Sequence, residues 1–317
     1  MSVISVHGLT KAFGSLDAVR GISLSLEEGE VLAVLGPNGA GKTTTIEILE
    51  GYLSRDGGEV SVLGTDPADG GTGFRQRIGI VLQEAGVEPY LTVAEVLRMH
   101  AGYYAAPRPL DEVIALVGLE TKADARVKTL SGGQQRRLDV ALGLVGDPEL
   151  LFLDEPTTGF DPSARRQAWE VVRNLSGLGK SVLLTTHYMD EAQALADRVI
   201  VISAGEIVAD GTPESLGGRD NADTEIRFLM PASVAVADLP VVVASVDDGV
   251  ALVSTAEPTA VLARLSAWAL DKCGELEQLT VTRPSLEDVY LALTAASDDG
   301  EPTPTPAPKV SRTRGRR

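Results

Sequence analysis

The sequence predicts an α/β fold whose core is a parallel sheet, followed by a smaller α+β domain. Three segments predict that sheet. Residues 31–35 form a strand that runs straight into a glycine-rich loop and a helix, and residues 150–153 form a continuous apolar strand of the kind buried in a parallel sheet. Residues 181–186 form a third strand, which ends at His187. Open α/β sheets place ligand contacts at the carboxyl ends of such strands.

The glycine-rich loop fits the pattern G-x-x-x-x-G-K-[ST] of a phosphate-binding P-loop. Small residues let consecutive backbone N–H groups turn inward around phosphate oxygens, and the helix that begins near Gly41 adds its positive dipole end. We expect Lys42 to reach the β- and γ-phosphates, Thr43 to offer its hydroxyl to Mg²⁺, and Thr44 to add a phosphate contact. The predicted nucleotide-binding residues here are Gly36, Pro37, Asn38, Gly39, Ala40, Gly41, Lys42, Thr43 and Thr44.

Length and composition limit the domain organisation, location and partners that the chain can have. A chain of 317 residues has room for one large domain and a smaller one. No stretch approaches the roughly 18 to 20 consecutive apolar residues of a membrane-spanning helix, and the first residues lack a signal-peptide pattern, so a cytosolic chain is expected. The net charge of -17 disfavours nucleic-acid partners. The single cysteine, Cys273, cannot form an internal disulfide and is expected to be a packing residue.

The N-terminal segment predicts an antiparallel sheet at one edge of the nucleotide. Apolar and polar residues alternate at residues 3–6 and 22–26, with a turn after Phe13. The ring of Phe13 is placed to stack on adenine, and the alternative is a hydrophobic turn residue.

A helical insert is predicted at about residues 84–145. It follows two strands at residues 57–64 and 77–82, the first interpreted as a hairpin strand and the second ending at Gln83. Because Gln83 ends a central strand, we expect it to contact Mg²⁺ or the attacking water. Thr92 and Glu95 form a capping box that opens a helix through about Tyr104, and a second helix begins at Pro109.

The insert ends with the segment Leu130-Ser-Gly-Gly-Gln134, which precedes ten residues with helical apolar spacing. Ser131 is a good N-cap, so Gly132 and Gly133 lie at a helix N-terminus whose exposed N–H groups favour an anion. By itself such a start is weak evidence of a site.

Two adjacent carboxylates, Asp154 and Glu155, follow the apolar strand 150–153. Carboxylates that emerge from a buried strand are costly unless they have a function. Asp154 suits the Mg²⁺ shell, and Glu155 suits a base that orients or deprotonates water. Asp161 caps a helix that has Pro162 at its first position and runs to about Leu175. His187 is placed to hydrogen-bond a γ-phosphate.

With these motifs in order, residues 2 to about 216 resemble the nucleotide-binding subunit of ABC transporters. The resemblance is specific because Leu130-Ser-Gly-Gly-Gln134 matches the signature that separates ABC ATPases from other P-loop proteins. It implies a P-loop NTPase fold of the ABC type, with a parallel core sheet, an antiparallel β edge and a helical insert. It also implies roles: Phe13 as the adenine-stacking aromatic without the hydroxyl of the family's usual tyrosine, Gln83 as the Q-loop, Glu155 as the catalytic glutamate, Asp161 as the D-loop and His187 as the switch histidine.

The same resemblance implies the ligands and the assembly. ATP and Mg²⁺ are the expected cofactors. In that family two copies sandwich two ATP molecules, so Ser131, Gly132, Gly133 and Gln134 of one copy would close over the phosphates held by the P-loop of the other. A monomer would then be a poor ATPase.

Residues 217–296 predict the small α+β domain. Strands are expected at residues 224–229, 241–245, 250–254 and 279–282, with a helix at about 259–272. Its ending, residues 284–294, has a capping-box-like start and resembles that of ABC-2 type exporter ATPases, the group of the daunorubicin-resistance-like exporters. The alternative is a stabilising appendage shared by ATPases with several kinds of cargo. Residues 297–317 form a Pro/Thr-rich basic tail that is expected to be disordered.

These features predict an ATP-hydrolysing subunit that powers export of a hydrophobic or drug-like compound, lipid or antibiotic. The membrane-spanning part would be a separate ABC-2 type permease, with this chain at the cytoplasmic face of the plasma membrane, and the composition favours a bacterium. One alternative is an importer or a glycan- or lipid-export ATPase. Another is a soluble ABC ATPase acting on the ribosome or DNA, disfavoured by a single cassette without long coiled coils. A regulator without turnover is disfavoured by the intact Glu155 and His187.

Overall fold

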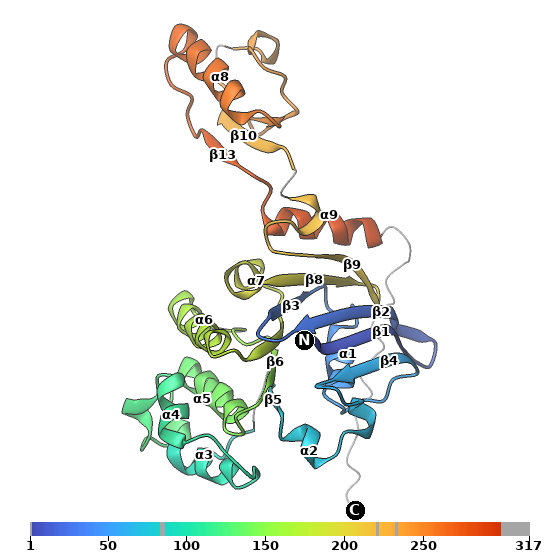
Figure 1. Cartoon of the computed structure of the whole chain (residues 1–317). Helices are drawn as coiled ribbons and strands as arrows, with labels where there is room; N and C mark the ends of the chain where they lie inside the picture. Colours follow the sequence, from blue (N-terminus) through green and yellow to red (C-terminus); the bar gives the residue numbers. More distant parts are fainter. Residues whose placement is uncertain (1, 83–85, 220–221, 232–233, 299–317) are drawn as a thin grey trace, which may run out of the picture.

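The structure is a computed structural model that describes residues 2–82, 86–219, 222–231 and 234–298 (Figure 1). Gln83 and residues 299–317 of the predicted tail lie outside the described residues. The prediction of disorder from residue 297 was wrong for Ser297 and Asp298, which end the last helix. Within the described ranges, none of the helices combines the length and apolar character needed to cross a membrane.

A six-stranded sheet forms the centre of the larger domain, in the order β5-β6-β7-β3-β8-β9. The strands are β5 (Ile78–Val81), β6 (Leu150–Asp154), β7 (Ser181–Thr185), β3 (Val31–Leu35), β8 (Arg198–Ser203) and β9 (Glu206–Gly211). Neighbouring strands from β5 to β8 are parallel, and β9 is antiparallel to β8. The predicted parallel core is confirmed, and β8 and β9 form an antiparallel pair at its edge.

The central strands are apolar throughout because both of their faces are covered. In β3, Val31, Ala33 and Leu35 pack into the core on the helical side. Leu32 and Val34, between them, pack into a second core on the opposite face. Alternate residues of a strand point to opposite faces, so a strand buried on both sides is apolar at every position.

The second core is closed by a three-stranded antiparallel sheet in the order β2-β1-β4 and by α1 (Lys42–Leu49). The strands are β1 (Ser2–Phe13), β2 (Leu16–Glu27) and β4 (Gly57–Val62). The predicted N-terminal hairpin is confirmed. The interpretation of residues 57–64 as a hairpin strand was wrong, because β4 pairs with β1 rather than with a strand adjacent in sequence.

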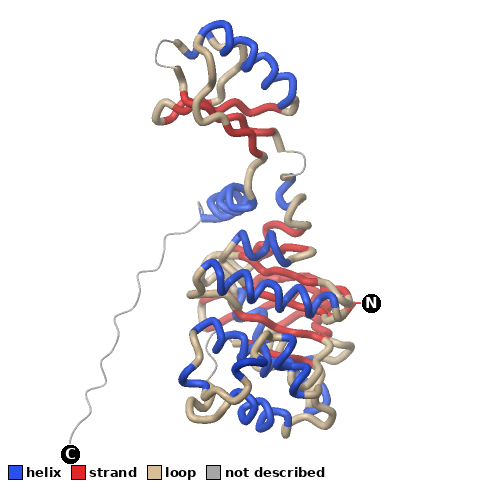
Figure 2. The backbone as a smooth tube through the Cα atoms, turned by 90° about the vertical axis from the view of Figure 1, so that its left-hand side faces the viewer, coloured by secondary structure: helices blue, strands red, loops and turns tan. Residues whose placement is uncertain are grey.

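Helices pack against the other face of the parallel sheet (Figure 2). They are α3 (Val93–Ala101), α4 (Leu110–Leu116), α5 (Gly132–Leu144), α6 (Pro162–Gly177) and α7 (Met189–Leu195). Short elements are α2 (Thr72–Arg75) and the 3-10 turns η1 (Pro67–Asp69), η2 (Glu120–Lys122), η3 (Val127–Thr129), η4 (Leu216–Gly218) and η5 (Val236–Asp238). The capping box of Thr92 and Glu95 and the cap by Asp161 are confirmed.

The smaller domain contains a four-stranded sheet, β11-β12-β10-β13, and a helix. Its elements are β10 (Thr224–Leu229), β11 (Ser245–Asp247), β12 (Val250–Thr255), α8 (Pro258–Lys272) and β13 (Thr280–Thr282). The strand predicted at residues 241–245 was wrong, since strand structure begins only at Ser245 and Val242 is 88% exposed. Cys273 is exposed rather than packed.

The last helix, α9 (Leu286–Asp298), follows the smaller domain in sequence but packs on the larger one. It lies between the two parts of the molecule in Figure 1. Leu286 is 3% exposed and belongs to the core on the helical side of the parallel sheet. The chain therefore leaves the larger domain to form the smaller one and returns to the larger domain at α9.

Candidate nucleotide-binding site

The P-loop connects β3 to α1, and two of its glycines cannot be replaced without strain. Gly36 has φ 156°, and a Cβ there would lie 2.2 Å from the carbonyl oxygen of Ile202. Gly41 has φ 99°, and a Cβ there would lie 2.3 Å from the carbonyl oxygen of Ala18. Backbone in this region of φ suits glycine. The loop is therefore fixed between β8 on one side and the N-terminal sheet on the other.

A cavity of about 500 Å³ lies beside the P-loop. It brings together three segments distant in sequence: the loop, the end of β6 and the second residue after β7. Its lining residues are Gly36, Pro37, Asn38, Thr43, Asp154, Glu155, His187 and Tyr290. The predicted convergence of polar groups at the carboxyl ends of the strands is observed, and Tyr290 joins them from α9.

Lys42 is buried at the base of the P-loop, with 8% of the residue exposed. Its Nζ donates to the carbonyl oxygens of Gly36 at 2.7 Å and Pro37 at 3.0 Å. Burial lowers the pKa of Lys42, while the carboxylates of Glu155 and Asp154 act to raise it. The Lys42 amine therefore lies within the P-loop, whose bound phosphates it is predicted to contact.

Thr185, at the end of β7, positions both carboxylate residues. Its hydroxyl donates to Asp154 Oδ1 at 2.6 Å and accepts from the backbone N–H of Glu155 at 3.0 Å. Thr185 was not among the predicted site residues. The sequence did contain a signal, since two threonines, Thr185 and Thr186, directly follow the apolar run Val182–Leu184.

Glu155 adopts a left-handed backbone conformation with φ 45°. Such a conformation is uncommon for a residue with a side chain and concentrates at functional sites. Its Oε1 lies 3.2 Å from His187 Nδ1, and its Oε2 accepts from the Thr158 hydroxyl at 3.0 Å. The carboxylate is therefore held from two sides next to the P-loop cavity.

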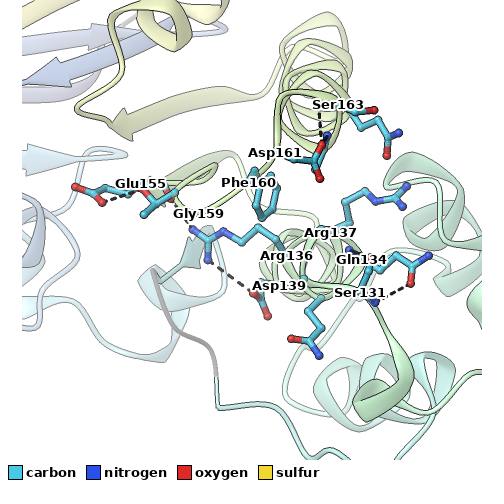
Figure 3. A pocket seen from close by; sticks show the side chains of 16 residues that line it. Ser131, Gln134, Arg136, Arg137, Asp139, Glu155, Gly159, Phe160, Asp161 and Ser163 are labelled. Carbon is cyan, nitrogen blue, oxygen red and sulfur yellow. Dashed lines mark hydrogen bonds and ion pairs between the residues drawn. The ribbon is translucent and has the colours of Figure 1, made fainter.

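The signature segment lines a different cavity, of about 960 Å³ (Figure 3). Ser131 caps α5, as the sequence predicted, and the structure adds a capping box between Ser131 and Gln134. The residues of this second cavity include Ser131, Gly132, Gly133, Gln134, Glu155 and Asp161. Glu155 lines both cavities, but among the described residues no P-loop residue lines the signature cavity. Within one chain the signature and the P-loop do not face a common space.

Arg136 connects the signature helix to the catalytic strand and was missed by the sequence reasoning. It is 7% exposed, and its guanidinium donates to the carbonyl oxygens of Leu82, Asp154 at 2.8 Å and Pro156 at 3.0 Å. Asp139 lies 3.7 Å away. Burial lowers the pKa of Arg136 and raises that of Asp139 to about 6. The available signal was its spacing four residues before Val140, which places Arg136 on the buried face of α5.

Four further predicted residues, Phe13 and the P-loop residues Gly39, Ala40 and Thr44, do not line the cavity beside the P-loop. Phe13 ends β1 and is 49% exposed, with Lys11 Nζ 5.5 Å from its ring centroid. Gly39 is exposed, Ala40 is buried and Thr44 is half-buried. The role of Phe13 in adenine stacking stays a prediction, as does that of Gln83 outside the described residues.

The oxygen donors for a divalent cation fit the predicted Mg²⁺. Thr43 and Asp154 line the same cavity, and the Asp154 carboxylate is fixed by Thr185. Hydroxyl and carboxylate oxygens, completed by phosphate oxygens and water, are the ligands Mg²⁺ prefers.

Glu50 is a buried carboxyl group at the end of α1. It lines a third cavity, of about 320 Å³, and is 6% exposed. Burial, reinforced by the charges of Asp154 and Glu47, raises the pKa of Glu50 to about 8. The folded chain therefore holds this proton more tightly than the unfolded chain does.

We expect Glu50→Gln to remove a pH-dependent loss of stability. Because the folded pKa lies above the ordinary value of 4.5, the Glu50 contribution is fully present below about pH 4.5 and is lost as the pH rises towards 8. Relative to Glu50→Gln, the wild type should lose about 1–3 kcal/mol of unfolding free energy between pH 5 and pH 8.5. Denaturant unfolding at both pH values measures this. Glu59→Gln, at an exposed position of β4, is the control. If the unfolding free energies of wild type and Glu50→Gln changed with pH in the same way, the raised pKa of Glu50 would be contradicted.

Thr185→Val should reduce ATP turnover about tenfold, because it releases the Asp154 carboxylate and leaves the Glu155 N–H with one partner fewer. Val keeps the volume of the buried threonine, so stability should fall by only about 1–2 kcal/mol. Ser181→Ala is the matched control: its hydroxyl accepts from the Gly29 N–H at 3.0 Å at the opposite end of β7. Loss of turnover in Ser181→Ala equal to that in Thr185→Val would mean that general weakening of β7 is responsible.

Comparison with known proteins agrees with this geometry. A model of the ABC transporter family matches residues 19–158, and a model described as ABC transporter domain-containing protein-like, C-terminal domain, matches residues 224–285. The chain is 40% identical over 304 residues to a daunorubicin resistance ATP-binding protein of Streptomyces coeruleorubidus, which covers 92% of this chain and 96% of that protein. It is 42% identical over 219 residues to the Nod factor export ATP-binding protein I of Ralstonia nicotianae, covering 68% of each chain.

The solved structures give the same fold. The dimeric bacterial ABC transporter cassette MJ0796 superposes with a TM-score of 0.59 at 26% identity, covering 66% of this chain and 98% of that one. The chain therefore belongs to the ABC transporter family, as one of its ATP-binding ATPase proteins.

Proposed function

We propose that this chain is the ATP-hydrolysing subunit of an exporter whose membrane-spanning part is a separate permease of the ABC-2 type. The observation that carries the proposal is the cavity in which Thr43, Asp154, Glu155 and His187 converge beside the P-loop. Export is supported by the relatives, a daunorubicin resistance protein and a Nod factor export protein that are both ATP-binding. The first of these relatives matches nearly the whole chain, including the smaller domain.

The chemistry assigned to the site follows from its donors and acceptors. Glu155 orients or deprotonates a water for in-line attack on the γ-phosphate of ATP, and His187 steadies the Glu155 carboxylate and meets the γ-phosphate. Lys42 exchanges its contacts with the loop carbonyls for the β- and γ-phosphates. Thr43 and Asp154, with Gln83, would hold Mg²⁺, which supplies positive charge to the phosphate oxygens.

Two copies of the chain are proposed to act together. The signature residues and the P-loop of one chain line separate cavities, so a signature segment can meet bound phosphate only if a second copy supplies it. In this arrangement Ser131, Gly132, Gly133, Gln134 and Asp161 of one copy complete the site of the other. The exposed N-terminus of α5 offers N–H groups and a positive dipole end to the phosphates. The dimeric cassette MJ0796 supports this arrangement.

The chain would work at the cytoplasmic face of a bacterial plasma membrane. The test is to isolate it from membranes in mild detergent and identify the integral-membrane protein that accompanies it. A polytopic partner at near-equal stoichiometry that stimulates ATP hydrolysis by the wild type, and not by Lys42→Ala, is expected. Recovery with ribosomes or nucleoid, and no stimulation by a membrane protein, would overturn the exporter assignment.

A further inference from the structure

Helix α9 is seated on the larger domain by close and specific contacts. A Cβ on Gly217 would lie 2.5 Å from Val289 Cγ1, so η4 and α9 touch without spare room. Arg219 donates from Nε to the carbonyl oxygen of Pro284 at 2.7 Å and from a terminal nitrogen to Gln193 Oε1 at 2.7 Å. Arg219 precedes the smaller domain and Pro284 follows it, so these bonds connect the two ends of that domain to each other and to α7. The position of α9 is therefore fixed relative to the helix that follows His187.

This seat brings Tyr290 to the wall of the P-loop cavity, together with Thr43, Glu155 and His187. Tyr290 is half-buried and packs against the apolar core on the helical side of the sheet. A tyrosine has an apolar ring and a polar tip, and with the ring packed on the core the hydroxyl end is the part left to face the cavity. Burial raises the pKa of Tyr290, so its hydroxyl keeps its proton and can donate.

We propose that Tyr290 is a further ligand of bound ATP, its hydroxyl donating a hydrogen bond to the terminal phosphate, so that the C-terminal helix forms part of the nucleotide site. This rests on the proposed ATP site. The cavity already contains two carboxylates, Asp154 and Glu155, which repel phosphate, and a neutral donor opposes that repulsion. ADP lacks the γ-phosphate, which is the terminal phosphate of ATP. The contact therefore lets α9, and the smaller domain attached to it, distinguish ATP from ADP.

The test is nucleotide affinity of the full chain for a non-hydrolysable ATP analogue and for ADP, by titration calorimetry in Mg²⁺. Tyr290→Phe removes the hydroxyl alone and should weaken binding of the analogue about tenfold while leaving ADP affinity within twofold. Leu291→Ala, at a 55% exposed position of the same helix, is the control and should change neither affinity. Thermal melts check that each variant is folded.

The outcomes separate the two assignments. An unchanged analogue affinity in Tyr290→Phe, or equal weakening of analogue and ADP, would overturn the role of Tyr290 while wild-type binding upheld the ATP site. Wild type that binds neither nucleotide would overturn the ATP site and the role of Tyr290 together. Tyr290→Ala should show the same selective loss, since it also lacks the hydroxyl.

Discussion

Glu155→Gln is expected to lower ATP turnover at least about 100-fold while leaving ATP binding intact. The amide keeps the size of the side chain and can still accept from the Thr158 hydroxyl, which bonds Glu155 Oε2 at 3.0 Å. It cannot accept a proton from the attacking water. Because the ATP would be held and not consumed, the variant should accumulate as an ATP-bound pair of chains.

Steady-state hydrolysis, ATP retention on a filter and gel filtration with ATP measure these three consequences. Glu170→Gln is the control, since it removes a carboxylate at an exposed position of α6 that lines neither cavity. Full turnover in Glu155→Gln would refute Glu155 as the base. Loss of ATP binding together with turnover would instead show that Glu155 acts in binding, through its position between the P-loop and signature cavities.

The fold could be predicted from the sequence because its signals are local. The strands β3, β6 and β7 contain short apolar runs buried on both faces; β3 leads directly into the glycine-rich loop, and β6 and β7 lead into polar residues. The P-loop spacing and the caps by Ser131 and Asp161 also lie within a few adjacent residues. Such local patterns can be recognised without knowing which strands are neighbours in the sheet.

The missed residues depend on contacts between distant segments. Thr185 reaches Asp154 only because β7 pairs with β6. Arg136 reaches backbone carbonyls at residues 82 and 154–156 only because α5 packs over the ends of β5 and β6. Tyr290 comes from a helix that follows the smaller domain in sequence and packs on the larger one. The error at residues 241–245 has the opposite cause. An apolar run suggested a strand, but Val242 is exposed and lies in no strand.

Arg136→Met is expected to be strongly destabilising, costing about 3–5 kcal/mol of unfolding free energy. Arg136 is a buried cation, and its guanidinium satisfies the carbonyl oxygens of Asp154, Pro156 and Leu82. Methionine fills much of the volume but leaves these carbonyls without their donor. It also leaves Asp139, half-buried beside it, without its ion-pair partner.

The pH dependence tests this explanation. Asp139 has a pKa of about 6 with Arg136 present, and loss of the cation should raise it further. Below that pKa the carboxyl is neutral and its loss of partner costs little, so the destabilisation of Arg136→Met should be smaller at pH 5 than at pH 8. Urea unfolding at both pH values measures it, with Arg137→Met as a control because Arg137 is half-buried on the same helix and donates to Gly118 O at 2.9 Å. A loss below about 1 kcal/mol at both pH values, or one equal to that of Arg137→Met, would mean that packing of α5 rather than Arg136 holds the signature helix against the catalytic strand.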